Sequence, residues 1–144
     1  MRKGPMFGNS SSIAVIGLGT FGTAVACKAR ENGARVLGVD IQQQIVDRMA
    51  DELDDTIGAD ARDAKALKEC ALDDHDVVVI AVGSDVEASL MAAHHAKSLG
   101  AKRLFVKAQC EDQTAILRAI GVDEVLRPEV DAGHALADRL SSGE

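Results

Sequence analysis

The sequence predicts an α/β fold built on a parallel sheet, and three observations lead to it. From Ser12 onward, short aliphatic runs alternate with longer amphipathic stretches, which is the pattern of repeated β-α units. The connections between them are short, and a helix between successive strands returns the chain so that the strands run parallel. The length of 144 residues suits one domain of this kind.

The expected strands are rich in Val, Ile and Leu, as strands covered on both faces are. The clearest is the continuous apolar run Val77–Val82. The helical stretches repeat apolar residues at helical spacing, and Gly33, Gly100 and Gly121 each end one of them. We expect strands at 13–16, 36–39, 55–57, 77–82, 103–107 and 124–126, and helices at 21–32, 42–53, 64–70, 86–99, 113–120 and 131–140.

Two β-α-β halves joined by right-handed crossovers form a Rossmann-type, doubly wound sheet. The predicted fold therefore has six parallel strands in the order 3-2-1-4-5-6, with helices on both faces. Residues 1–11 are rich in Gly, Pro, Asn and Ser, and we expect them to be a disordered N-terminal lead. The ordered domain is expected to span residues 12–140.

Composition excludes several classes of function. The 16 basic and 23 acidic residues give a net charge of −7, which argues against nucleic-acid binding because no net positive field attracts phosphates. Three Phe with no Trp or Tyr leave few rings on which bases could stack. Three cysteines without CxxC spacing predict a reducing, cytoplasmic location. The apolar runs are too short to cross a membrane.

A glycine-rich loop follows the first expected strand. The residues Gly17-Leu18-Gly19-Thr20-Phe21-Gly22 form a G-x-G-x-x-G motif between a strand and a helix, where a dinucleotide-binding loop belongs. Gly17 permits the tight turn, Gly19 lets the backbone approach a pyrophosphate, and Gly22 lets the helix pack close to the sheet. The helix N-terminus would then face the phosphates. The alternative is that these glycines serve only a tight connection.

Asp40 ends the second expected strand, 23 positions after Gly17. A carboxylate there accepts hydrogen bonds from both ribose hydroxyls of an adenosine and repels a 2′-phosphate. Residues 41–44 contain no Arg, so NADP is disfavoured, whereas NAD, NADH, ATP, ADP and AMP stay open. Gly83 and Ser84 end the fourth strand and are expected to line the same site, although an ordinary turn glycine explains Gly83 equally well.

The sequence shows no recognisable catalytic motif. It contains no Ser-His-Asp, HExxH or P-loop signature. His94 and His95 are neighbours on one expected helix, so they point about 100° apart, and His134 is expected at the surface of the last helix. We expect His75 to be solvated, and the acidic residues within 51–55 to form a solvated helix end. A nucleotide site without catalytic groups predicts a sensor rather than an enzyme.

Three further segments resemble the RCK/KTN family, whose TrkA-N domains regulate potassium channels and transporters. Gly58–Asp63 is similar to the family's G-D-A motif with one inserted residue, and Val106–Gln109 and Arg127–Gly133 are similar to two more family segments. The likeness is closest to regulatory subunits of Ktr/Trk potassium uptake systems. It implies a nucleotide-binding domain that controls a potassium channel or transporter by ligand-dependent conformational change. A cofactor-binding half of an NAD-dependent oxidoreductase would explain the glycine loop but not these segments.

The resemblance also implies roles for single residues. Asp60 and Ala61 would contact the adenine edge, and Lys107 would reach toward the phosphates. Glu129 matches a carboxylate near a dimer interface, where some members bind a divalent cation. The implied cofactor-binding residues are Gly17, Gly19, Thr20, Phe21, Gly22, Asp40, Ile41, Asp60, Ala61, Ala81, Gly83, Ser84 and Lys107.

Two departures from the family pattern refine this picture. Thr20 stands where many ATP-responsive members carry an Arg, and a hydroxyl supplies neither the charge nor the bidentate geometry of that Arg. NAD(H) is therefore favoured over ATP, ADP or AMP. Residues 141–144 are expected to be a tail, with the family's C-terminal regulatory domain absent. Leu136 and Leu140 would leave an apolar stripe on the last helix, which predicts a homodimer and, as in the family, an octameric ring peripheral to the inner membrane face.

Overall fold

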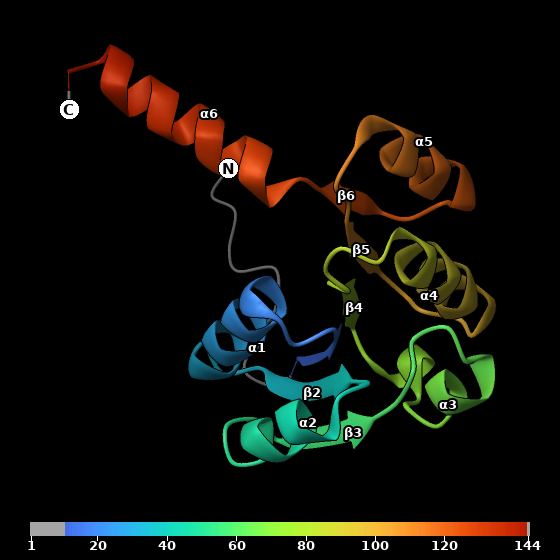
Figure 1. Cartoon of the computed structure of the whole chain (residues 1–144). Coiled ribbons are helices and arrows are strands. Elements are labelled where there is room, and N and C mark those ends of the chain that lie inside the picture. Colours follow the sequence, from blue (N-terminus) through green and yellow to red (C-terminus); the bar gives the residue numbers. More distant parts are fainter. Residues whose placement is uncertain (1–10, 144) are drawn as a thin grey trace, which may run out of the picture.

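The computed structural model describes residues 11–143; apart from Ser11, the predicted N-terminal lead lies outside the described residues. Six parallel strands form one sheet in the order β3-β2-β1-β4-β5-β6 (Figure 1), which confirms the predicted fold. The strands are β1 (Ser12–Ile16), β2 (Arg35–Asp40), β3 (Asp55–Gly58), β4 (Val77–Ile80), β5 (Leu104–Lys107) and β6 (Glu124–Leu126). The helices are α1 (Thr20–Glu31), α2 (Gln43–Met49), α3 (Ala64–Lys68), the 3-10 helix η1 (Leu72–Asp74), α4 (Val86–Ser98), α5 (Glu111–Ile120) and α6 (Pro128–Ser141).

Helices cover both faces of the sheet and bury two separate cores. Side chains alternate between the faces along each strand, so Val78 and Ile80 of β4 join the core under α3, α4 and α5. Val77 and Val79 join the core under α1 and α2. This double burial explains why the central strands are continuous apolar runs rather than alternating ones.

Helix α6 differs from the other long helices because it projects away from the body of the domain (Figure 1). None of its described side chains is buried, and Leu136 and Leu140 are 45% and 66% exposed. The apolar stripe expected on this helix is therefore open to solvent. Within the described residues, no helix is both long enough and apolar enough to cross a membrane.

Several expected boundaries were wrong by a few residues. The second helix ends at Met49 rather than at residue 53, because the acidic residues that follow oppose the negative end of the helix dipole. The last helix begins at Pro128 rather than at residue 131, since proline suits the first helical position. The fourth strand stops at Ile80, two residues early, and the turn helix η1 (Leu72–Asp74) was not expected.

Carboxylates bind the backbone at the amino-terminal ends of the strands, which we call the amino edge of the sheet. Asp76, Asp54 and Asp123 each accept a hydrogen bond, at 2.6 to 2.8 Å, from the backbone N–H of the first or second residue of a strand. His75 is half-buried there rather than solvated, which corrects the expectation. Its Nδ1 lies 2.6 Å from Ser12 Oγ, and its Nε2 donates to the Cys70 carbonyl oxygen at 3.3 Å. The acidic and histidine residues of this edge are thus structural.

Candidate nucleotide-binding site

The glycine loop has the geometry that its motif predicts. Gly17 has a φ of +100°, and a Cβ atom there would lie 2.5 Å from the Ala81 carbonyl oxygen of the neighbouring turn. A Cβ on Gly22 would overlap the Gly17 carbonyl oxygen, whereas a Cβ on Gly19 would meet no atom within 4 Å. Gly17 and Gly22 are therefore required by close packing of the loop, and Gly19 faces open space where a phosphate could approach.

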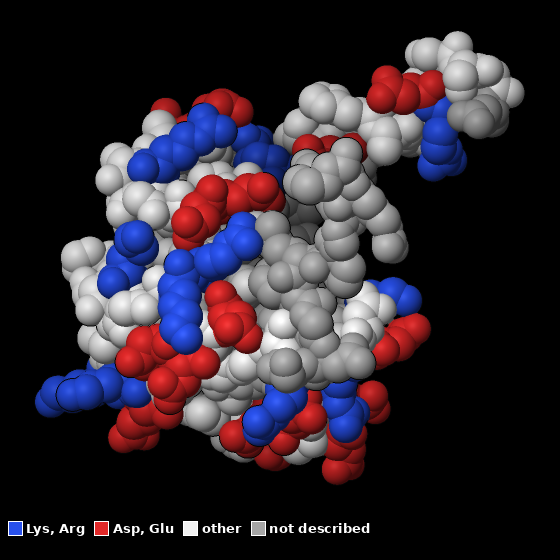
Figure 2. Space-filling view, turned by 180° about the vertical axis from the view of Figure 1, so that it is seen from behind, with Lys and Arg blue, Asp and Glu red and all other residues white. Residues whose placement is uncertain are grey.

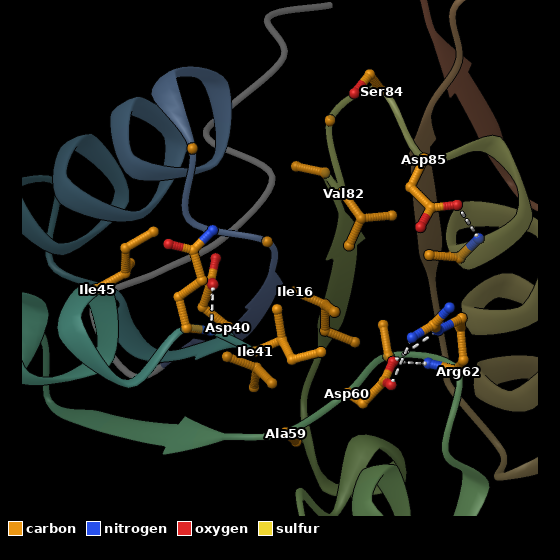
Figure 3. A pocket seen from close by; sticks show the side chains of 18 residues that line it. Ile16, Asp40, Ile41, Ile45, Ala59, Asp60, Arg62, Val82, Ser84 and Asp85 are labelled. Carbon is orange, nitrogen blue, oxygen red and sulfur yellow. Dashed lines mark hydrogen bonds and ion pairs between the residues drawn. The ribbon is translucent and has the colours of Figure 1, made fainter.

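A cavity of about 320 Å³ opens at the carboxyl-terminal ends of the strands, the carboxyl edge of the sheet. It lies where the strand order reverses between β1 and β4. This is the place at which doubly wound sheets bind their ligands. Figure 3 shows its two walls, with Asp40, Ile41 and Ile45 on one side and Asp60, Arg62 and Asp85 on the other. The lining residues are Ile16, Gly17, Gly19, Val39, Asp40, Ile41, Gln42, Ile45, Ala59, Asp60, Ala61, Arg62, Ala81, Val82, Gly83, Ser84, Asp85 and Ala88.

Asp40 joins the glycine loop to the wall of the cavity. One carboxylate oxygen accepts from the Leu18 N–H at 2.8 Å, and the other accepts from the Gln42 N–H at 2.9 Å. A carboxylate oxygen can accept two hydrogen bonds, so each oxygen keeps one free position. The side chain can therefore fix the loop and still receive both hydroxyls of a ribose.

Asp60 forms a bidentate ion pair with Arg62, which also lines the cavity. Nε and Nη2 of Arg62 lie 3.1 and 3.0 Å from the two carboxylate oxygens of Asp60. The side-chain hydrogen bonds from Arg62 lower the pKa of Asp60 below its ordinary value, and the same pairing raises the pKa of Arg62. Both groups stay charged. Arg62 was not predicted from the sequence, although it stands inside the Gly58–Asp63 segment.

The turn after β4 forms the upper rim of the cavity in Figure 3. Gly83 has a φ of +33°, and its carbonyl oxygen accepts from Gln109 Nε2 at 2.8 Å. Asp85 caps α4 by accepting from the Ala88 N–H at 2.9 Å. Gly83 and Ser84 line the cavity as predicted. Asp85 was not predicted from the sequence, although its position just before an apolar helix was an available signal.

Four predicted site residues, Thr20, Phe21, Gly22 and Lys107, are not among those that line the cavity. Thr20 is exposed at the start of α1. Lys107 is only 14% exposed; its Nζ lies 5.7 Å from the centre of the Phe21 ring and 3.9 Å from Glu129 Oε1. In this structure the lysine thus connects α1 and α6 instead of reaching into the cavity.

Glu129, the predicted cation ligand, lies beside that lysine at the start of α6. Among residues 11–143 there is no group of three or more His, Cys, Asp or Glu side chains that could hold a metal ion. One exposed carboxylate next to an ammonium group does not make a divalent site, because a cation prefers several oxygen ligands. A cation at Glu129 stays a prediction that requires ligands from a second molecule.

Comparison with known proteins agrees with this geometry. Residues 13–128 match the TrkA-N domain. The chain belongs to the TrkA-N domain family. Ktr system potassium uptake protein A of Vibrio alginolyticus is 40% identical over 127 residues, which are 88% of this chain and 58% of that protein. Ktr system potassium uptake protein C of Bacillus subtilis is 33% identical over 129 residues, or 90% of this chain and 58% of that protein. This TrkA-N domain thus spans a little over half the length of these relatives.

Solved structures share the fold of this TrkA-N domain. GsuK bound to ADP has a TM-score of 0.77 at 21% identity, and the match covers 93% of this chain and 35% of that one. The GsuK channel bound to NAD has a TM-score of 0.71 at 11% identity, over 81% of this chain and 21% of that one. At these identities the likeness shows the fold alone.

Proposed function

We propose that this chain is the nucleotide-sensing domain of a regulatory subunit that controls a potassium channel or transporter. The observation that carries the proposal is the cavity in which Gly17, Gly19 and Asp40 meet at the switch point of the sheet. The family and the Ktr potassium uptake relatives support it. A regulatory role rather than an enzymatic one agrees with the use of His75 and His95 in hydrogen bonds to backbone carbonyl oxygens.

The ligand is an adenine nucleotide with a free ribose diol. Asp40 has one open acceptor position on each carboxylate oxygen for that diol and would repel the 2′-phosphate of NADP. ADP and NAD in the GsuK structures support an adenine nucleotide. Among the described cavity residues the sole Lys or Arg is Arg62, which is already paired with Asp60. NAD(H) is therefore favoured over ATP, whose terminal phosphate finds no free cation there.

Binding would be transmitted to α6 through two sets of contacts. Gln109 donates to the Gly83 carbonyl oxygen at the rim, and its own carbonyl oxygen accepts from Arg127 Nη2 at 3.4 Å. Arg127 immediately precedes α6 and also pairs with Glu111 at 2.9 Å. A ligand that moves the Gly83 turn thereby changes the start of α6. For this coupling to act, the ligand must favour one orientation of the helix by roughly 1–3 kcal/mol.

The Lys107 contacts form the second path between the glycine loop and α6. Phe21 lies in the first turn of the helix that follows the loop, and Lys107 lies between its ring and Glu129. Phosphate binding at the loop would shift the first turn of α1, and a shift of the Phe21 ring would move the lysine relative to Glu129. The helix start would then lose one of its attachments.

Helix α6 also indicates how this chain would associate with partner proteins. The exposed side chains of Leu136 and Leu140 on α6 suit contact with a second copy, giving a homodimer and, by assembly of dimers, an octameric ring. The acidic and basic side chains are interspersed on the face that Figure 2 shows, which suits protein partners better than nucleic acid. The regulated partner would be a membrane potassium channel or transporter subunit, with this chain cytoplasmic at the inner membrane face.

Potassium uptake by the source cells tests this function. Asp40→Ala in the native gene should reduce nucleotide-dependent uptake to the level of a strain that lacks the gene, because the ribose contact is lost. Asp54→Ala is the control, since it removes an amino-edge carboxylate that also accepts a hydrogen bond from a backbone N–H but lies outside the cavity. Wild-type uptake in the Asp40→Ala strain would contradict the proposal.

The route to α6 is tested separately by hydrogen exchange of the isolated chain. NAD should change the exchange of backbone amides at 17–22 and in the segment 128–131, whose N–H groups belong to residues 129–131, since both paths end at the start of the helix. Gln109→Ala should keep the change at 17–22 and reduce that at 128–131. Nucleotide binding without any change at 128–131 would contradict the coupling.

A further inference from the structure

The side chain of Arg62 is 43% exposed and lies on the cavity wall opposite Asp40 and Ile41 (Figure 3). Its bidentate pairing with Asp60 fixes the plane of the guanidinium, and Nη1 lies 3.8 Å from Glu87 Oε1. The backbone is fixed too, because the Arg62 N–H donates to Asp60 and the Arg62 carbonyl oxygen accepts from His95 Nε2 at 3.0 Å. A flat, oriented cation thus forms part of the wall.

Asp60 has little capacity left to contact a base directly. Its Oδ1 accepts from both the backbone N–H and Nε of Arg62, at 2.9 and 3.1 Å. Its Oδ2 accepts from Nη2 at 3.0 Å. With two acceptor positions on each oxygen, Oδ1 is filled and Oδ2 keeps one. Arg62, by contrast, has five N–H donors and uses two of them on Asp60.

The opposite wall offers an apolar surface. Ile41 is 60% exposed although it lines the cavity, and Ile45 lines the same wall on the other side of Asp40 (Figure 3). Ile41 thus lies on one wall of the cavity and the Arg62 guanidinium on the other. A planar group can bind between an aliphatic side chain and a guanidinium. The ribose position at Asp40 is next to Ile41 in the chain, so the base of the same nucleotide falls within reach of this slot.

We propose that Arg62 is the residue that determines nucleobase specificity, with the base between Ile41 and the guanidinium, and that Asp60 is a positioning residue that holds Arg62. This inference rests on the proposed function and deepens it. It replaces a direct contact of Asp60 with the adenine edge. Because a guanidinium attracts a larger aromatic face more strongly, the slot favours a purine over a pyrimidine.

Calorimetric titration of the chain with AMP and with CMP tests the inference. The two ligands share ribose and 5′-phosphate, so the ratio of their affinities reports the base alone. The unaltered chain should bind AMP about tenfold more tightly than CMP, and Arg62→Ala should bring that ratio close to one. Arg62→Lys should lose most of the ratio as well, because an ammonium keeps the charge but not the plane.

Two further variants separate positioning from general effects. Asp60→Asn should lower the ratio by about threefold, since Arg62 remains but is held less firmly. Arg118→Ala is the matched control, because Arg118 is exposed on α5 and does not line the cavity; it should leave both affinities unchanged.

The outcomes distinguish this inference from the proposed function. An unaltered AMP-to-CMP ratio in Arg62→Ala, or equal loss of both ligands in Arg62→Ala and Arg62→Lys, would overturn the role of Arg62 in base recognition and leave the nucleotide sensor in place. Binding of neither ligand by the unaltered chain would overturn the proposed function itself, and the role of Arg62 with it.

Discussion

Two cavities lie at opposite edges of the same sheet, and the larger one is not the candidate site. The amino-edge cavity measures about 420 Å³ and the carboxyl-edge cavity about 320 Å³. At the amino edge, polar side chains hold the starts of strands: Ser12 Oγ lies 2.6 Å from His75 Nδ1, and the Asp54 carboxylate accepts from the Val36 N–H. At the carboxyl edge, Asp40 keeps an open acceptor position on each oxygen, and Gly19 faces open space.

The difference lies in which hydrogen-bonding groups remain available for a ligand. An aspartate caps a strand end at both edges, so residue type does not separate the two. What separates them is the glycine loop, which leaves backbone N–H groups at the N-terminus of α1 without partners in the helix. A buried or partly buried donor of this kind favours an anion. Cavity volume alone would have selected the amino edge instead.

The largest effect is expected from adding one methyl group to the glycine loop at Gly22. Gly22→Ala should lower the free energy of unfolding by about 3 kcal/mol, because the new Cβ overlaps the Gly17 carbonyl oxygen, which belongs to the backbone and cannot turn aside. Chemical denaturation measures this. Gly133→Ala is the control: its Cβ meets no atom within 4 Å, so it should stabilise by up to about 1 kcal/mol. A loss below about 1 kcal/mol in Gly22→Ala would contradict the packing described for the loop.

A pair of aspartate variants compares the two edges directly. Asp40→Ala should weaken NAD binding about tenfold to a hundredfold, the usual cost of a hydrogen bond to a charged group. Asp54→Ala should leave NAD affinity unchanged and instead lower the free energy of unfolding by about 1 kcal/mol, because the Val36 N–H loses its acceptor. Calorimetry and denaturant unfolding of both variants would decide, and equal affinities would remove the distinction between the edges.

A smaller effect is expected at the amino edge from Cys70. Burial raises the pKa of the Cys70 thiol from 9.0 to about 11. Between these two pH values the thiol is protonated in the folded chain and ionised in the unfolded chain. Its contribution to stability is therefore complete below pH 9 and is lost as the pH rises toward 11. The stability difference between the unaltered chain and Cys70→Ala should shrink by about 1 kcal/mol from pH 7 to pH 10. A constant difference would contradict the burial of this thiol.

The sequence was sufficient for the architecture because the strands are short aliphatic runs and the helices between them repeat apolar residues at helical spacing. Gly17, Gly22 and Asp40 could be placed since their motif specifies a turn and a strand end. Arg62 could not, because it reaches the cavity only when the loop after β3 lies against α4, a contact made by the His95 hydrogen bond; Asp85 had a signal in its position just before an apolar helix. Lys107 was assigned to the phosphates by resemblance, whereas tertiary packing places it against Phe21 and Glu129.

Calorimetric titration of the unaltered chain with NAD, NADH, ATP, ADP, AMP and NADP tests the central claim most directly. Arg62, the sole Lys or Arg among the described residues of the cavity, is already paired with Asp60. NAD or NADH should therefore bind at least about tenfold more tightly than ATP, whose terminal phosphate lacks a cationic partner. Asp40 accepts a free ribose diol and would repel a 2′-phosphate. NADP should bind more weakly still. Binding of NADP as tight as that of NAD, or no binding of any nucleotide, would contradict the account.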